Sequence, residues 1–67
     1  MTRRKMSATV RRLRKARNMT QAELAKKAGV TQGYVSRLEA GTKTELGARV
    51  ALRLAAALGV AVTELLA

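Results

Sequence analysis

The chain has 67 residues, enough for one domain with a small core, and its low aromatic content with many Ala, Leu and Val residues suits short packed helices better than a sheet. It contains no Cys and no His, which excludes disulfides, the usual zinc sites and nucleophile chemistry based on either residue. Because no apolar run approaches the roughly 18 residues of a membrane span and the basic start lacks the apolar segment of a secretory signal, we expect a cytoplasmic protein.

The N-terminal quarter of the chain is strongly basic and predicts an arm followed by a helix. It holds eight of the 14 Lys and Arg residues and no acidic residue. Because residues 1–6 show no periodicity, we expect a flexible basic arm there and a folded domain over residues 7–67. Ser7 or Thr9 is a suitable N-cap for a helix that runs to about Arg17. The inward-facing residues of this helix are predicted to be Val10, Leu13 and Ala16.

The net charge of +10 is high for so short a chain and indicates a charged partner. The alternatives are a merely solvated basic surface, an anionic membrane and nucleic acid. A membrane-surface helix needs a bulky apolar face opposite its charges, and the basic N-terminal segment lacks one. We therefore expect the partner to be nucleic acid.

The middle of the chain predicts two short helices joined by a tight turn. Thr20 and Glu23 have the spacing of a capping box at the start of the first helix, and Gly29 supplies its left-handed end. Thr31 caps the second helix, and Gly41 ends it. The inner faces of the two helices are predicted to carry Leu24, Ala25, Ala28, Val35 and Leu38.

The outward face of the second of these helices carries the information about function. At about 100° per residue, this face comprises Gln32, Gly33, Ser36, Arg37 and Ala40. A plain solvated helix would show more Lys and Glu. Small residues let a helix approach a surface closely, and Gln and Arg form bidentate hydrogen bonds with adenine and guanine edges. The pattern therefore predicts contact with DNA bases.

The sequence leaves the start of the next helix open. Thr42 with Glu45 would form one capping box, and Thr44 is a second candidate cap. A loop followed by a helix from Gly47 or Ala48 is the third alternative.

Two further helices are predicted in the C-terminal third, over residues 48–58 and 62–66, with Gly59 ending the first of them. The inward residues of the longer helix are predicted to be Ala51, Leu54, Ala55 and Leu58. The four glutamates of the chain are spread over different segments, and the sequence shows no metal cluster, phosphate-binding loop or activated nucleophile. We expect no enzymatic activity, no metal and no cofactor.

The motifs TQAELA at 20–25, GVTQ at 29–32 and SRLEAG at 36–41 resemble, in this order and spacing, the Cro/repressor (Xre-like) helix-turn-helix family. The resemblance extends over about residues 8–66. It implies an all-α, compact five-helix lambda-repressor-like DNA-binding domain with the helix-turn-helix at its second and third helices. It also implies a sequence-specific regulator of transcription, with repression the favoured role, that reads the major groove of double-stranded DNA with residues 32–40.

The resemblance assigns roles to individual side chains. The base-contacting residues would be Gln32 for adenine, Arg37 for guanine, and Gly33 and Ser36 for further bases. Phosphate contacts are expected from Gln21, Tyr34, Thr42, Lys43, Thr44 and, on the basic first helix, Arg12. The alternative for Tyr34 is to cover the core. Arg14 would form a structural ion pair with Glu39 and so tie the first helix to the end of the third.

Surplus apolar residues near the C-terminus predict a homodimer. Because one recognition helix reads only a few base pairs, the family uses dimers on palindromic operators. The residues expected to pack across the two-fold axis are Val60, Val62 and Leu66. In the alternative arrangement, Val62 and Leu65 close the core of a single chain.

A second function remains open from the sequence. The family includes antitoxins of toxin–antitoxin pairs, and the segment ALRLA at 51–55 resembles their fourth helix. Such a protein would bind a toxin partner as well as its own promoter.

Overall fold

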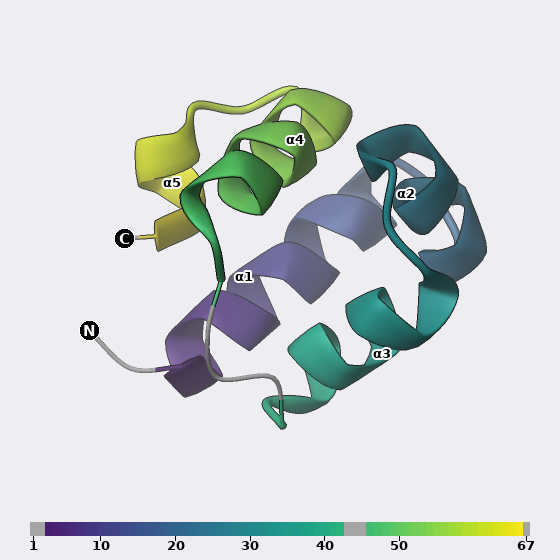
Figure 1. The fold of residues 1–67 in the computed structure, drawn as a ribbon, viewed down its shortest axis with the longest axis horizontal. Helices are drawn as coiled ribbons and strands as arrows, with labels where there is room; N and C mark the ends of the chain where they lie inside the picture. Colours follow the sequence, from purple (N-terminus) through teal and green to yellow (C-terminus); the bar gives the residue numbers. More distant parts are fainter. Residues whose placement is uncertain (1–2, 43–45, 67) are drawn as a thin grey trace.

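Five α-helices form the part of the chain that the structure describes (Figure 1). This computed structural model describes residues 3–42 and 46–66, and the side chains of residues 6–42 and 46–65. No strand occurs in these two ranges, and the predicted all-α fold with five helices is confirmed. The helices are α1 (Arg3–Ala16), α2 (Gln21–Ala28), α3 (Gln32–Ala40), α4 (Ala48–Leu58) and α5 (Val62–Leu66).

The helices enclose a single core. Helix α1 packs against α3 and α5, α2 packs against α3 and α4, and α4 packs against α5. In Figure 1, α2 and α3 lie on the right of the molecule and α5 lies on the left. None of the described helices has the length and apolar character needed to cross a membrane.

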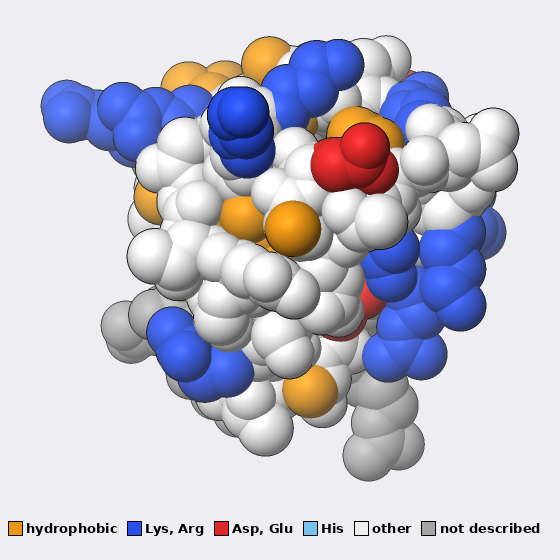
Figure 2. All heavy atoms as spheres, turned by 90° about the vertical axis from the view of Figure 1, so that its right-hand side faces the viewer, with side chains coloured by type: hydrophobic (Ala, Val, Ile, Leu, Met, Phe, Trp, Pro, Cys, Tyr) orange, Lys and Arg blue, Asp and Glu red, His pale blue; other side chains and the backbone are white. Residues whose placement is uncertain are grey.

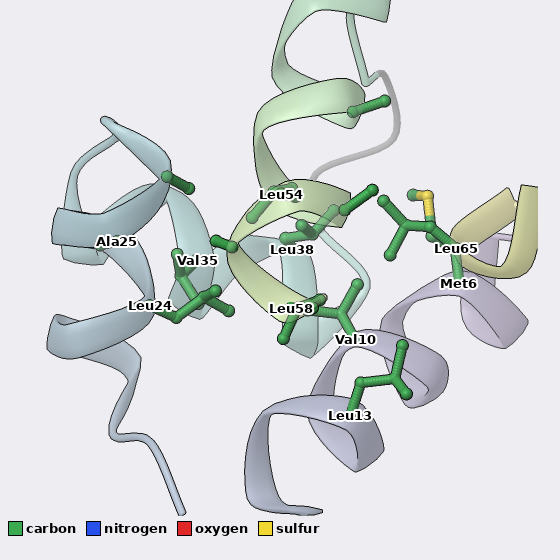
Figure 3. Packing of buried hydrophobic residues seen from close by; sticks show 14 residues of the cluster. Met6, Val10, Leu13, Leu24, Ala25, Val35, Leu38, Leu54, Leu58 and Leu65 are labelled. Carbon is green, nitrogen blue, oxygen red and sulfur yellow. The ribbon is translucent and has the colours of Figure 1, made fainter. Parts of the chain in front are cut away.

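The core is built from side chains of all five helices (Figure 3). Its largest fully buried side chains are Val10, Leu24, Val35, Leu38, Leu54, Leu58 and Leu65. Buried alanines of α2 and α4 lie between them, and such small side chains let the short helices approach one another closely. The inward residues predicted for α2, α3 and α4 are all buried, and Ala57 of α4 is buried in addition.

The start of α1 differs from the prediction. The helix begins at Arg3 rather than near Ser7 or Thr9, so residues 3–6 of the expected arm are helical. Residues 1–2 lie outside the described part. Met6 and Ser7 are both buried, and packing of this turn against the core favours a helix that no local cap predicts.

The end of α1 also differs in one respect. Ala16 was expected to face inward but is exposed. Val10 and Leu13 are buried, and each further step of three residues turns the helix face by about 60° in the same direction. At Ala16 this rotation has carried the side chain off the core.

Local capping fixes the two central helices. Thr20 Oγ1 accepts a hydrogen bond from the Glu23 amide at 3.0 Å, and Glu23 Oε1 accepts one from the Thr20 amide at 2.8 Å. Thr31 Oγ1 accepts a hydrogen bond from the Tyr34 amide at 3.1 Å. Gly29 follows α2 with a φ of 74°, a left-handed conformation that glycine adopts without steric cost. The predicted capping box and turn are therefore present.

Helix α4 begins at Ala48, with Gly47 as its N-cap, in agreement with the third alternative for this region. Thr42 lies at the end of α3 instead, where its hydroxyl donates a hydrogen bond to the Arg37 carbonyl oxygen at 3.1 Å. Thr44 and Glu45 lie outside the described residues.

Candidate nucleic-acid interface

The outward face of α3 carries all four predicted base-contacting residues. Gln32, Gly33, Ser36 and Arg37 are exposed, whereas Val35 and Leu38 on the opposite side of the helix are fully buried. The two buried side chains therefore fix the rotation of α3 about its axis. The helix presents an amide, a hydroxyl and a guanidinium to solvent on one continuous surface.

Charge is distributed unevenly over the face formed by α2 and α3. Figure 2 shows this side of the molecule, with mostly uncharged atoms over its centre, including exposed hydrophobic side chains, and with Lys and Arg side chains around its edges, where an acidic side chain also lies. A groove of DNA presents hydrogen-bonding base edges between two rows of phosphates. A largely uncharged centre with a mainly basic rim is complementary to that arrangement.

Glu39 at the end of α3 joins three helices. Arg14 of α1 donates hydrogen bonds from Nε to Glu39 Oε2 at 2.7 Å and from Nη2 to Oε1 at 3.0 Å. Gln21 of α2 donates from Nε2 to Glu39 Oε1 at 3.0 Å. The Glu39 side chain is only 3% exposed, and that of Arg14 is 12% exposed. The ion pair predicted from the sequence is thus a buried, bidentate contact.

The surroundings of Glu39 also set its charge. Burial alone would raise the pKa of Glu39, but hydrogen bonds from Arg14 and Gln21 and the charges of Arg14 and Arg11 outweigh that effect and hold its pKa below the ordinary value. The hydrogen bond to Glu39 in turn raises the pKa of Arg14. Both groups are therefore charged at neutral pH.

Arg11 belongs to the same cluster and was not singled out from the sequence. Its Nη2 donates a hydrogen bond to the Glu39 carbonyl oxygen at 2.9 Å, and its Nε lies 3.9 Å from Glu39 Oε1. A cation at the C-terminal end of a helix is favourable because carbonyl groups and the helix dipole converge there. Arg11 lies three residues before Arg14, and this spacing could have indicated that both face Glu39.

The predicted phosphate-contacting residues do not share one location. Gln21 lies at the start of α2 with its amide directed to Glu39, and Thr42 closes the end of α3. Arg12 is exposed on α1, and by helical spacing it projects about 160° away from Arg14, on the side of α1 opposite Glu39. Lys43 and Thr44 lie outside the described residues.

Tyr34 occupies an intermediate environment. It is half-buried and packs against the core, and burial raises the pKa of its hydroxyl. The side chain therefore does cover the core, and its hydroxyl keeps its proton at neutral pH. Among the described residues there is no group of three or more His, Cys, Asp or Glu side chains that could hold a metal ion.

Comparison with known proteins identifies this arrangement. A family model described as helix-turn-helix matches residues 10–65. The chain belongs to the helix-turn-helix family. Within that family motif, α2 and α3 are the two helices and residues 29–31 form the turn between them.

Solved structures of transcription regulators have the same helix-turn-helix fold. The restriction-modification controller protein C.AhdI from Aeromonas hydrophila is 32% identical with a TM-score of 0.89, and the match covers 94% of each chain. The clp gene regulator ClgR from C. glutamicum is 33% identical with a TM-score of 0.86, covering 98% of this chain and 84% of that one. A hypothetical transcription factor, NHTF from Neisseria, is 31% identical with a TM-score of 0.92, and the match covers 100% of this chain and 76% of that one. The comparison with curated proteins finds no match.

Proposed function

We propose that this DNA-binding transcriptional regulator is a repressor that inserts α3 into the major groove of a palindromic operator. The observation that carries the proposal is the outward face of α3, where Gln32, Ser36 and Arg37 are exposed beside the small residue Gly33. The similarity to proteins described as a controller, a gene regulator and a transcription factor supports a regulatory role. The protein would act in the cytoplasm as a homodimer, without catalysis and without a cofactor.

The base contacts follow from the donors and acceptors on α3. The amide of Gln32 matches the N6 and N7 positions of adenine, and the guanidinium of Arg37 matches O6 and N7 of guanine. The Ser36 hydroxyl can accept or donate a hydrogen bond, so it discriminates less between bases. We therefore assign the recognition of the DNA base sequence to Gln32 and Arg37.

The phosphate contacts are proposed around this face. The first turn of α2 offers backbone N–H groups without acceptors inside the helix, beside the Gln21 amide. The Gln21 side-chain amide has a second N–H besides the one that donates a hydrogen bond to Glu39. In this proposal the second N–H donates to a phosphate, so Gln21 connects the Arg14–Glu39 ion pair to the DNA backbone. The remaining phosphate ligands proposed around this face are Tyr34, Thr42, Lys43 and Thr44, and Arg12 is proposed as a contact outside it, because it projects to the opposite side of α1.

Selection of bound sequences from a random DNA pool tests the reading of bases. The parent should select one palindromic motif, and Gln32→Ala or Arg37→Ala should each relax one base position per half-site, at a cost of roughly 1–3 kcal/mol. Lys43→Ala is the control, because loss of a proposed phosphate contact beyond α3 weakens binding to all sequences about equally. A double variant of Gln32 and Arg37 that selects the parent motif would disprove the assignment.

The salt dependence of binding tests the phosphate contacts. For about 8–10 contacts across a dimer, log affinity should fall against log salt with a slope on the order of −7 to −9. Lys43→Ala should make the slope shallower by about 1 for each phosphate contact that is lost. A slope near zero for the parent would exclude nucleic acid as the main partner.

A further inference from the structure

The backbone conformation of residue 33 does not require a glycine. Gly29, Gly41 and Gly59 have φ values between 71° and 81° and close helices, and Gly47 is the N-cap of α4. Gly33 instead lies inside α3 as its second residue, without a positive φ. Because glycine destabilises a helix relative to alanine, a glycine at this exposed position calls for an explanation outside the backbone.

A side chain at residue 33 would crowd the end of the Arg37 side chain. A Cβ atom built on Gly33 would lie 3.3 Å from Arg37 Nη1, closer than ordinary van der Waals contact, and 4.0 Å from Thr31 Oγ1. Arg37 follows four residues later on the same face of α3, and helical side chains lean toward the N-terminus. The Arg37 guanidinium therefore lies back along α3, over its first turn.

Little else fixes the Arg37 guanidinium. Within the described part of the chain it forms no hydrogen bond or ion pair with another residue. Its position near Gly33 requires that residue 33 carry no Cβ in the space beside Arg37 Nη1. The first turn is also the part of a recognition helix whose side chains contact base edges.

We propose that Gly33 determines base specificity through Arg37. By lacking a Cβ, it lets the Arg37 guanidinium lie close to the first turn of α3, where two N–H groups can meet O6 and N7 of one guanine. A methyl group at residue 33 requires the Arg37 guanidinium to shift by a few tenths of an ångström, which disturbs this bidentate geometry. Gly33 is thus a positioning residue, and its role rests on the proposed reading of DNA by α3.

The alternative role for the missing Cβ is to let DNA approach the α3 backbone directly. A double-mutant cycle separates the two, because only a role through Arg37 depends on the presence of Arg37. The four proteins are the parent, Gly33→Ala, Arg37→Ala and the double variant. Each is measured by fluorescence anisotropy on the site that the parent selects and on the same site with the Arg37-dependent guanine replaced.

Arg37→Ala should reduce discrimination at one guanine on the order of tenfold or more. Gly33→Ala should reduce discrimination at the same guanine several-fold, and the double variant should be no worse there than Arg37→Ala alone. The melting temperature of Gly33→Ala should equal or exceed that of the parent, since alanine is the better helix former. This control separates loss of specificity from loss of folding.

Two outcomes would overturn the inference, and they have different consequences. If Gly33→Ala weakens binding by the same factor with and without Arg37, the methyl group acts on DNA directly, and the proposed function stands while the inference fails. If Arg37→Ala leaves every base preference unchanged, the assignment of Arg37 in the proposed function fails and the inference fails with it.

Discussion

At the scale of single residues, Glu39 is the only buried charged side chain among the residues that the structure describes. It is almost fully buried, yet its carboxylate oxygens accept hydrogen bonds from Arg14 of α1 and Gln21 of α2. A buried carboxylate is costly unless it is paired, and here the pairing connects the recognition helix to both neighbouring helices. No buried side-chain N or O atom among the described residues lacks a partner.

Removing one partner of the Arg14–Glu39 ion pair should destabilise the fold strongly. Arg14→Met leaves the Glu39 carboxylate buried without its bidentate partner, and the free energy of unfolding should fall by about 3–5 kcal/mol in urea titrations. Lys15→Met at the exposed neighbouring position should change it by about 0.5 kcal/mol or less. Adding Glu39→Leu to Arg14→Met should recover a large part of the loss. A loss below about 1 kcal/mol in the single variant would contradict the assigned role.

The lowered pKa of Glu39 predicts an acid-sensitive fold. Between the folded pKa and the unfolded value of about 4.3, the unfolded chain binds more protons, so stability rises with pH. The contribution of Glu39 is therefore fully present above the unfolded pKa and is lost as pH falls through the lower folded pKa. Urea titrations across this range should show a shallower pH dependence for Glu39→Gln than for the parent. Equal slopes would show that Glu39 does not couple stability to pH.

At the scale of elements, helix boundaries were predictable where local chemistry sets them. Helices α2 and α3 begin at the predicted caps Thr20 and Thr31, because capping requires only residues close in sequence. The start of α1 was not predictable, since it depends on the burial of Met6 against other helices. The same distinction between local and tertiary determinants applies to the candidate nucleic-acid interface. Periodicity predicts the outward face of α3, whereas the contact of Arg11 with the end of α3 depends on how α1 packs.

The capping box of α2 gives a direct test of local stabilisation. Thr20→Ala removes the acceptor of the Glu23 amide and should lower the free energy of unfolding by about 1 kcal/mol. For a domain of this size, that change corresponds to a fall in melting temperature of about 4–8 °C. Thr20→Ser retains a hydroxyl acceptor and serves as the matched control. Equal melting temperatures for Thr20→Ala and Thr20→Ser would mean that the cap does not stabilise the domain.

At the scale of the whole molecule, apolar surface remains near the C-terminal helices. Leu65 is fully buried, while Val60 and Val62 are only partly buried against the core. Leu52 of α4, 59% exposed, is the only large hydrophobic side chain that is exposed in the described part. Helix α5 lies across the molecule from α2 and α3 (Figure 1), so an interface there leaves the recognition helix free. One protomer measures 26 × 22 × 22 Å, less than the roughly 34 Å between the half-sites of a palindromic operator, so two half-sites require two protomers.

We therefore expect a two-fold dimer in which Val60, Val62 and Leu66 pack across the axis, although the side chain of Leu66 lies outside the described part. Val62→Glu and Leu66→Glu should abolish cooperative binding to a palindromic site and leave binding to a half-site unchanged, because charge is costly in an apolar interface. Thr63→Glu, at an exposed position of α5, makes the same charge change and should keep cooperativity. Since Val62 also contacts the core, the helix content of each variant is measured first by circular dichroism. Folded Val62 and Leu66 variants with parental cooperativity would place the interface elsewhere, and Val62 and Leu65 would then serve only to close the core.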